Sequence, residues 1–266
     1  MPSFLCFRLH GPLAAWGDIA VGGTRPSTPH ASRSAVLGLV AAALGIRRED
    51  ADSCAALDRS FGFASRTDAP GALLIDYHTA QGPEEKDLRA EERAARKANL
   101  PWHRPATRRA ELAYPRADLA TVLSSRQYRV DALYTVALWP LDAAPHWSLE
   151  HLQTALRAPH FVPYLGRKSC PLDLPMEPQV IGASDPVSAL TRSKFSTDVL
   201  VAPVLERGRG SATVQWEGEW SGLVAAQTVR RRDRVLSRAR WQFTERQEHQ
   251  QAWNPDAGGG HAPQQG

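Results

Sequence analysis

Alternating apolar and polar positions near the start of the chain predict a strand, a loop and a buried helix, in that order. Residues 4–9 are apolar on both alternating sides except at Arg8, which suits a central strand that Gly11 and Pro12 bring to an end. The run AVLGLVAAAL that follows Ser34 has no polar face, so we expect a helix buried on most sides. Ser34 is its predicted N-cap.

The same pattern continues through the middle of the chain. Residues 60–67, 72–78 and 131–139 predict further strands, and Ser148 is the expected N-cap of a helix that carries leucines on one face. Strand, helix, paired strands and helix in this order predict an α+β fold with a ferredoxin-like (RRM-like) βαββαβ core. A doubly wound nucleotide fold is disfavoured, because no GxGxxG follows Leu9 and no Walker lysine motif occurs.

Residues 81–127 interrupt this core. They include a charged, helix-prone stretch at 84–97 and two prolines at 101 and 105, without a continuous apolar face, so we expect an inserted arm outside the core. The predicted division is a core of residues 1–80 and 128–185, the arm at 81–127, a small C-terminal β-rich subdomain at 186–248 and a disordered tail at 249–266.

Composition and charge narrow the class of protein. The 266 residues are 42% hydrophobic and 23% charged, as in ordinary globular proteins, and the net charge of +4 permits nucleic-acid binding without proving it. The three cysteines are far apart, which predicts reduced thiols and neither a disulfide framework nor a zinc site. No run approaches the roughly 20 apolar residues of a membrane span and no signal peptide is evident, so we expect a cytoplasmic protein that does not associate with a membrane. We also expect no cofactor.

Two glycine-containing loops carry the candidate chemistry. The loop at 16–34 contains Arg25 and Arg33 among several glycines and prolines, a combination that can hold a phosphate chain. The loop PYLGRKSCP at 163–171 offers a glycine for close backbone approach, two adjacent cations, a hydroxyl and a tyrosine that can stack on a base. The arginine run at 230–234 has three interpretations: contact with RNA phosphates, contact with acidic faces of other proteins, or a solvated face.

Several ordered motifs resemble one protein family. GPLAAWG, TRP and SRSAVLGLVAAALGI in the first 46 residues, then DYHT, YTVALW, PYLGRKSCPL and ASDP, are similar to the CasD family, the Cas-five-family subunits of type I-E CRISPR Cascade complexes. The resemblance covers residues 3–190 and extends more loosely through RWQFTERQ towards residue 247. It implies a projecting thumb at 81–127.

The resemblance also implies a function and partners. It predicts a non-catalytic CRISPR RNA (crRNA)-binding subunit that caps the 5′ repeat-derived handle of the guide and contacts the Cascade backbone subunit and large subunit. Target DNA is then met only indirectly, because guide pairing reads its sequence. The residues expected to contact RNA are cations, hydroxyls, aromatic rings, a histidine and a loop glycine: Trp16, Arg25, Arg33, Ser34, His78, Arg108, Arg126, Tyr164, Gly166, Arg167, Lys168 and Ser169.

Two alternatives remain open from the sequence. A metal-independent endoribonuclease that processes repeat RNA, as in type I-C relatives, needs only a general base, a general acid and a cation, and Tyr77, His78 and Lys168 are suitable residue types. For His78 a structural hydrogen bond at a strand end is the plainer interpretation. A purely structural bridge between subunits predicts assembly without direct RNA contact.

Overall fold

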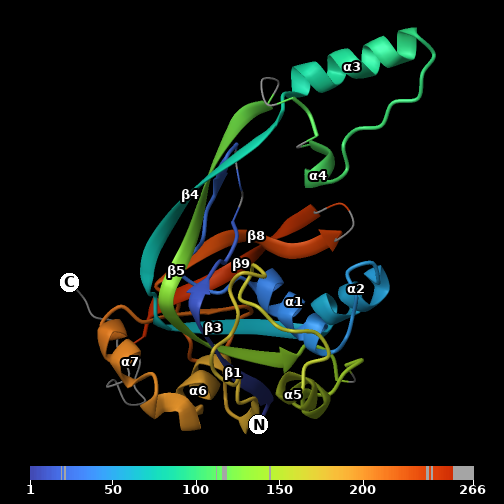
Figure 1. Ribbon diagram of the computed structural model, residues 1–266. Helices are drawn as coiled ribbons and strands as arrows, with labels where there is room; N and C mark the ends of the chain where they lie inside the picture. Colours follow the sequence, from blue (N-terminus) through green and yellow to red (C-terminus); the bar gives the residue numbers. More distant parts are fainter. Residues whose placement is uncertain are drawn as a thin grey trace. The chain divides into compact units, whose positions relative to one another are not determined.

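The chain forms two compact units. The computed structural model describes residues 1–18, 20, 22–111, 113–115, 119–143, 145–237, 240 and 242–253, and the side chain of Arg108 lies outside this description. One unit comprises Met1–Ala20, Pro26–Leu74 and Gln127–Gly266, and the other comprises Val21–Arg25 and Ile75–Arg126. The fold is mixed α/β, with a large antiparallel sheet and several helices (Figure 1).

The sheet is built around β1 and β5. Its strands run in the order β6-β1-β5-β3-β7-β9-β8, with these bounds: β1 (Ser3–Ala14), β3 (Phe61–Ala69), β5 (Leu119–Pro140), β6 (Gln179–Gly182), β7 (Thr213–Trp216), β8 (Gln227–Ser237) and β9 (Gln242–Ala252). Neighbours in this order pair antiparallel, and Phe7 lies opposite Val136. The predicted central strand at 4–9 is therefore confirmed.

Both faces of the sheet are covered by helices. Leu5, Phe7 and Leu9 belong to a buried cluster with residues of α1 (Arg33–Ala43) and α5 (Leu149–Arg157). Phe4 and Cys6, on the opposite face of β1, belong to a second cluster with α6 (Pro186–Arg192). The remaining helical elements of this unit are α2 (Ala51–Ser60), the 3₁₀ turn η2 (Ser196–Val199) and α7 (Ala202–Gly208). A strand buried on both sides explains why its sequence is apolar at nearly every position.

One of the two predicted helix N-caps is confirmed and the other is wrong. Ser148 caps α5, because its hydroxyl accepts a hydrogen bond from the His151 N–H at 3.2 Å, as predicted. The first helix begins two residues earlier than predicted: its N-cap is Ser32, whose backbone is extended, and Ser34 lies inside α1. The prediction of Ser34 as the cap was wrong because Arg33 is held in helical geometry by distant carboxylates, which a local pattern does not reveal.

The C-terminal strands extend the main sheet. β7 pairs with β3, with Ala64 opposite Trp216, and β9 then pairs with β7 and β8. Residues 186–248, predicted as a small C-terminal β-rich subdomain, contribute strands to the same sheet as the core. Residues 249–252 of the predicted tail belong to β9, and residues 254–266 lie outside the described residues.

The second unit contains a strand group and two helices. β4 (Ala72–Pro83) pairs with β5, and the short β2 (Thr24–Arg25) pairs with β5 in parallel, with Arg25 opposite Arg126. The chain leaves β4 through α3 (Glu85–Lys97), passes α4 (Arg108–Glu111) and returns to β5. The predicted inserted arm at 81–127 coincides in sequence with most of this unit.

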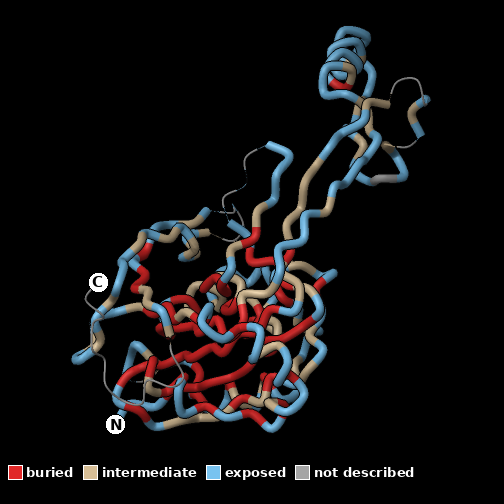
Figure 2. The backbone as a smooth tube through the Cα atoms, turned by 90° about the vertical axis from the view of Figure 1, so that its left-hand side faces the viewer, coloured by how far each residue is buried: buried red, intermediate tan, exposed pale blue. Residues whose placement is uncertain are grey.

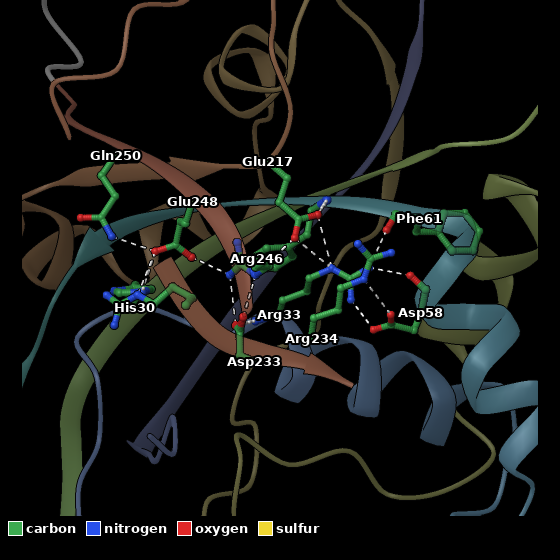
Figure 3. Close-up of polar contacts among 12 residues, drawn as sticks. His30, Arg33, Asp58, Phe61, Glu217, Asp233, Arg234, Arg246, Glu248 and Gln250 are labelled. Carbon is green, nitrogen blue, oxygen red and sulfur yellow. Dashed lines mark hydrogen bonds and ion pairs between the residues drawn. The ribbon is translucent and has the colours of Figure 1, made fainter. Parts of the chain in front are cut away.

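A buried network of charges joins α1 to the C-terminal hairpin of the first unit (Figure 3). The Arg33 side chain is 1% exposed and donates to Glu217, to both carboxylate and carbonyl oxygens of Asp58 and to the Phe61 carbonyl. Its backbone N–H donates to Asp233 on β8 at 2.8 Å. Arg33 therefore links α1, α2, β3 and β8 in one contact set.

Arg246 on β9 is the second hub of this network. Its guanidinium lies 2.6 Å from Asp233, 3.2 Å from Glu217 and 2.5 Å from Glu248. Burial alone raises the pKa of Glu248, but the hydrogen bond from His30 and the charge of Arg246 hold this pKa well below its ordinary value. Burial also raises the pKa of Glu217, against the opposing charges of Arg33 and Arg246. The network is stabilising only while its buried charges remain balanced.

We expect Glu248→Gln to lower the free energy of unfolding by about 3 kcal/mol at pH 7, because it leaves Arg246 without one of its buried counter-charges. The native pKa of Glu248 lies below the ordinary value of 4.5, so the native state binds fewer protons than the unfolded state. This stabilisation is complete above that value and is lost as the pH falls below it. Urea unfolding should show that the difference in the free energy of unfolding between the wild type and Glu248→Gln is smaller at pH 4 than at pH 7.

The matched control is Glu219→Gln, which removes an 89% exposed carboxylate from the same part of the chain. Its effect should stay within about 0.5 kcal/mol at both pH values. A loss in Glu248→Gln that is equal at pH 7 and pH 4 would show that shape, and not charge, makes Glu248 stabilising.

Candidate nucleic-acid interface

The loop at 163–171 lies against the end of β1. The Ala15 N–H donates to the Leu165 carbonyl at 3.0 Å, and the Leu165 N–H donates to the Cys170 carbonyl at 2.8 Å. Tyr164 and Pro171 form a single antiparallel bridge, and the Leu165 side chain is fully buried in the first core cluster. The loop is thus anchored at both ends while Gly166, Lys168 and Ser169 are exposed.

Gly166 makes this close approach sterically feasible. Its φ is +83°, in the left-handed region, and a Cβ added there would lie 1.9 Å from the Ala15 carbonyl oxygen. No side chain can be accommodated at this distance, so the loop needs glycine at this position.

The two adjacent cations of the loop have different surroundings. Arg167 is partly buried: it donates to the Gln127 carbonyl at 3.2 Å, and its guanidinium carbon lies 4.7 Å from the centre of the Tyr128 ring. Lys168 is exposed. Arg167 therefore fixes the loop against β5 while it contributes charge, and Lys168 presents a mobile ammonium group at the surface.

Tyr164 borders a hollow. The hollow has a volume of about 530 Å³, and its walls include Phe161, Leu37 and Gly38 of α1, and Arg47. Tyr164 is 38% exposed, so part of its ring is accessible. An accessible ring beside an apolar wall and a nearby arginine is suitable for stacking an unpaired base.

Trp16 is placed in the core. Its ring is 1% exposed and meets the Tyr134 ring edge-on, with 5.3 Å between centroids. Its backbone N–H donates to the Ser27 hydroxyl at 3.0 Å, and its carbonyl accepts from the Thr28 N–H. This placement favours a packing role that joins the two ends of the first glycine loop, and it argues against the predicted contact of the ring with RNA.

Arg33 also differs from its predicted role. The sequence favoured a phosphate contact, but its guanidinium is enclosed by Asp58, Glu217 and two carbonyl groups. Ser34, the next residue of α1, is half-buried. An arginine in a glycine-rich loop carries no sequence signal of burial when its partners lie 25 to 200 residues away.

The arginine run at 230–234 contacts protein groups in this structure. Arg231 pairs with Glu248 at 3.2 Å, Arg234 with Asp58 at 3.5 Å and Arg230 with Glu245 at 3.9 Å. Arg232 donates to the Phe243 carbonyl at 3.1 Å. The structure therefore supports contact with acidic groups of this chain itself, an outcome that the three sequence-based interpretations did not include.

Four further predicted RNA contacts belong to the second unit. Arg25 is exposed and donates to the Gly22 carbonyl at 2.6 Å, and Arg126 is half-buried opposite it across the β2–β5 pair. His78 is exposed on β4, with its ring nitrogen 3.6 Å from Asp76. The side chain of Arg108 lies outside the described residues. Arg25 and Arg126 are thus the only pair of these that the described strand register brings side by side.

The described residues contain neither a metal-binding cluster nor a helix able to cross a membrane. No group of three His, Cys, Asp or Glu side chains is arranged to hold an ion in the described part of the chain. Within the same ranges, no helix is long and apolar enough to span a bilayer. Cys6 and Cys170 are buried free thiols, and burial raises the pKa of Cys6 to about 12, so this thiol stays protonated.

Two supporting residues of the loop have no signal in the sequence. Gln127 and Tyr128 hold Arg167 from 40 and 39 positions away, at the predicted boundary of the arm. Alternation along β5 could have indicated that Tyr128 is buried, but not which loop lies over it. A cation–π contact between distant segments becomes evident only from the fold.

Comparisons with known proteins indicate the family of the chain. The family model described as CRISPR-associated protein (Cas_Cas5) matches residues 4–248. The "CRISPR system Cascade subunit CasD" of Escherichia coli (strain K12) is 38% identical over 200 residues, which cover 71% of this chain and 76% of that protein.

Two solved structures are also similar. A chain of a "CRISPR RNA-guided surveillance complex" has a TM-score of 0.57 and 25% identity, covering 93% of this chain and 88% of that chain. A structure titled "Crystal structure of Cas protein" has a TM-score of 0.53 and 22% identity over 93% of both chains, which shows likeness of fold alone. From the family match and the 38% identity, the chain belongs to the Cas5 family of CRISPR-associated proteins.

Proposed function

We propose that this chain is a guide-RNA-binding subunit of a type I-E CRISPR Cascade complex and that it caps the 5′ repeat-derived handle of the guide. Its membership of the Cas5 family and its similarity to a Cascade subunit support the assembly. The observation that carries RNA binding is the anchored loop at 163–171, in which a glycine without room for a side chain precedes two cations. Such a loop suits the backbone of a single strand.

The proposed mechanism is led by phosphate contacts. Arg167 is oriented by Gln127 and Tyr128, so little side-chain entropy is lost when it meets a phosphate, and Lys168 adds a second charge. The exposed hydroxyl of Ser169 offers a hydrogen bond to the same strand. Tyr164 provides a stacking surface for a base that leaves the strand.

The rest of the chain is assigned to scaffold and assembly roles. We infer a ferredoxin-like core, because β6-β1-β5-β3 are antiparallel neighbours, with α1 and α2 following β1 and α5 following β5. In the proposed assembly the arm acts as the thumb, and the chain contacts the backbone subunit and the large subunit in the cytoplasm. The target's sequence is read by the guide, and not by this chain.

The proposal is binding without catalysis. Tyr77 is 80% exposed, and the exposed His78 has its ring nitrogen 3.6 Å from Asp76, which favours a local polar contact for this histidine. The endoribonuclease alternative requires Tyr77, His78 and Lys168 around one phosphate. Guide RNA of unchanged length after incubation with the purified chain supports binding alone, and specific cleavage of repeat RNA supports the alternative.

We expect Arg167→Ala combined with Lys168→Ala to weaken guide-RNA binding and to reduce the slope of log affinity against log salt by about 1.4, or 0.7 for each phosphate contact with a single strand. Lys168→Ala alone should produce about half of this reduction in slope without disturbing the loop, since Lys168 is exposed. The measurement is fluorescence anisotropy of a labelled repeat-derived RNA at several salt concentrations.

Arg207→Ala with Arg209→Ala is the matched control, because it removes two exposed cations from the same unit. It should change the slope by much less. Equal salt dependence in the wild type and in the loop double variant would contradict the loop assignment.

Gly166→Ala tests the loop's backbone independently of its charge. The added Cβ meets a carbonyl oxygen at 1.9 Å in a strained φ region, so the loop must move away from Ala15. We expect RNA binding to weaken at least tenfold while both cations remain present. Gly17→Ala is the control, because its Cβ meets no described atom within 4 Å. Full RNA affinity in Gly166→Ala would show that the loop's position is unimportant.

A further inference from the structure

Cations gather along one side of α3, the long helix of the second unit. At about 100° per residue, Lys86, Arg89, Arg93, Arg96 and Lys97 fall within a sector roughly 100° wide. The helix's four carboxylates, from Glu85, Asp87, Glu91 and Glu92, fall outside that sector. We call these five cations the α3 stripe. Charges of both signs are present in α3, but they are segregated around its axis.

The opposite side of α3 is covered by the returning chain of the same unit. Leu88 is the buried residue of the helix, and Glu91 nearby accepts hydrogen bonds from Tyr114 at 2.7 Å and from Trp102 at 3.4 Å. Arg104 pairs with Glu85 at 2.6 Å. The packed side is therefore fixed, and it leaves the α3 stripe uncovered within this unit.

All five residues of the α3 stripe are exposed, and Figure 2 shows most of this helix in the colour of exposed residues. Lys86 pairs with Glu84 at 2.8 Å and Arg89 with Glu85 at 3.2 Å, both at exposed positions where ion pairs contribute little and exchange readily. Arg93, Arg96 and Lys97 lie in the C-terminal half, where they also complement the helix dipole. Dipole complementarity accounts for cations in the last turn but not for a stripe that begins at Lys86.

Spacing and composition indicate the kind of ligand. From Lys86 to Lys97 the axis rises about 17 Å, which gives roughly one cation per 4 Å, comparable to the roughly 3.4 Å of duplex axis that each phosphate of one DNA strand occupies. On one side the stripe is bordered by Ala90 and Ala94, which offer neither an aromatic surface for stacking nor a group that reads base edges. On the other side it is bordered by Glu85, which pairs with Arg89 and Arg104, and by Glu92. This composition disfavours single strands and sequence-specific recognition.

We propose that the α3 stripe binds the phosphate backbone of double-stranded DNA without sequence preference, as a second nucleic-acid surface separate from the loop at 163–171. The inference rests on the proposed function, since an RNA-guided complex must meet duplex DNA before the guide pairs with it. It replaces the expectation that this chain meets target DNA only indirectly. The α3 stripe raises the local concentration of duplex, and the guide supplies recognition.

The test uses the full-length chain and a labelled 30-base-pair duplex that has no match to the guide. Arg93→Ala, Arg96→Ala and Lys97→Ala together should weaken duplex binding about tenfold and lower the salt slope by about 2.7, or 0.9 per phosphate contact. Alanine has a higher helix propensity than the residues it replaces, so α3 should remain folded. Arg207→Ala, Arg209→Ala and Arg230→Ala form the control, with the same loss of three exposed charges from the other unit.

Two further measurements separate this proposal from the proposed function. Guide-RNA retention by the assembled complex should be unchanged in the α3 variant and reduced in the variant lacking Arg167 and Lys168. Single-stranded DNA of equal length should lose little affinity in the α3 variant. The proposal is overturned if the α3 variant binds duplex like the wild type or like the control, if only single-strand binding falls, or if a protein subunit is lost while duplex affinity stays constant.

Discussion

The buried ion-pair network around Arg33 and Arg246 is the constraint on which the first unit depends. It ties the N-terminus of α1 to α2, β3, β8 and β9 through four carboxylates, and no other described polar cluster joins so many elements. The hairpin of β8 and β9 is rich in polar residues and has little apolar surface of its own. Charge pairing therefore performs the task that hydrophobic packing performs elsewhere in the sheet.

Arginines in this chain consequently serve two different purposes. Arg8, Arg33, Arg66 and Arg246 are buried and act as structural connectors, with Arg66 pairing to Asp68 at 2.6 Å and Arg8 pairing to Asp198. Exposed cations, which a polyanion can reach, lie in the loop at 163–171, on the second unit and elsewhere on the first unit, as at Arg207 and Arg209. A net charge of +4 conveys none of this distinction, because it sums buried connectors and exposed contacts together.

Local patterns predicted the elements whose partners are close in sequence or whose faces are uniform. Alternation at residues 4–9 gave the central strand and its two faces, and Ser148 gave a helix start, both as found. Trp16, Arg33 and the run at 230–234 could not be placed, because their contacts come from strands up to 200 residues away. β9 was missed for a related reason: QFTERQEHQQA is a poor strand former, and its pairing with β7 and β8 stabilises it.

The most direct test of RNA binding is to express the chain with the other subunits encoded beside it and a repeat array, to crosslink, and to sequence the RNA attached to this chain. The account predicts a single repeat-derived 5′ end, with crosslinks on peptides that contain residues 163–171. Subunits that co-purify without any RNA crosslink to this chain would contradict it and would leave a purely structural bridge between subunits.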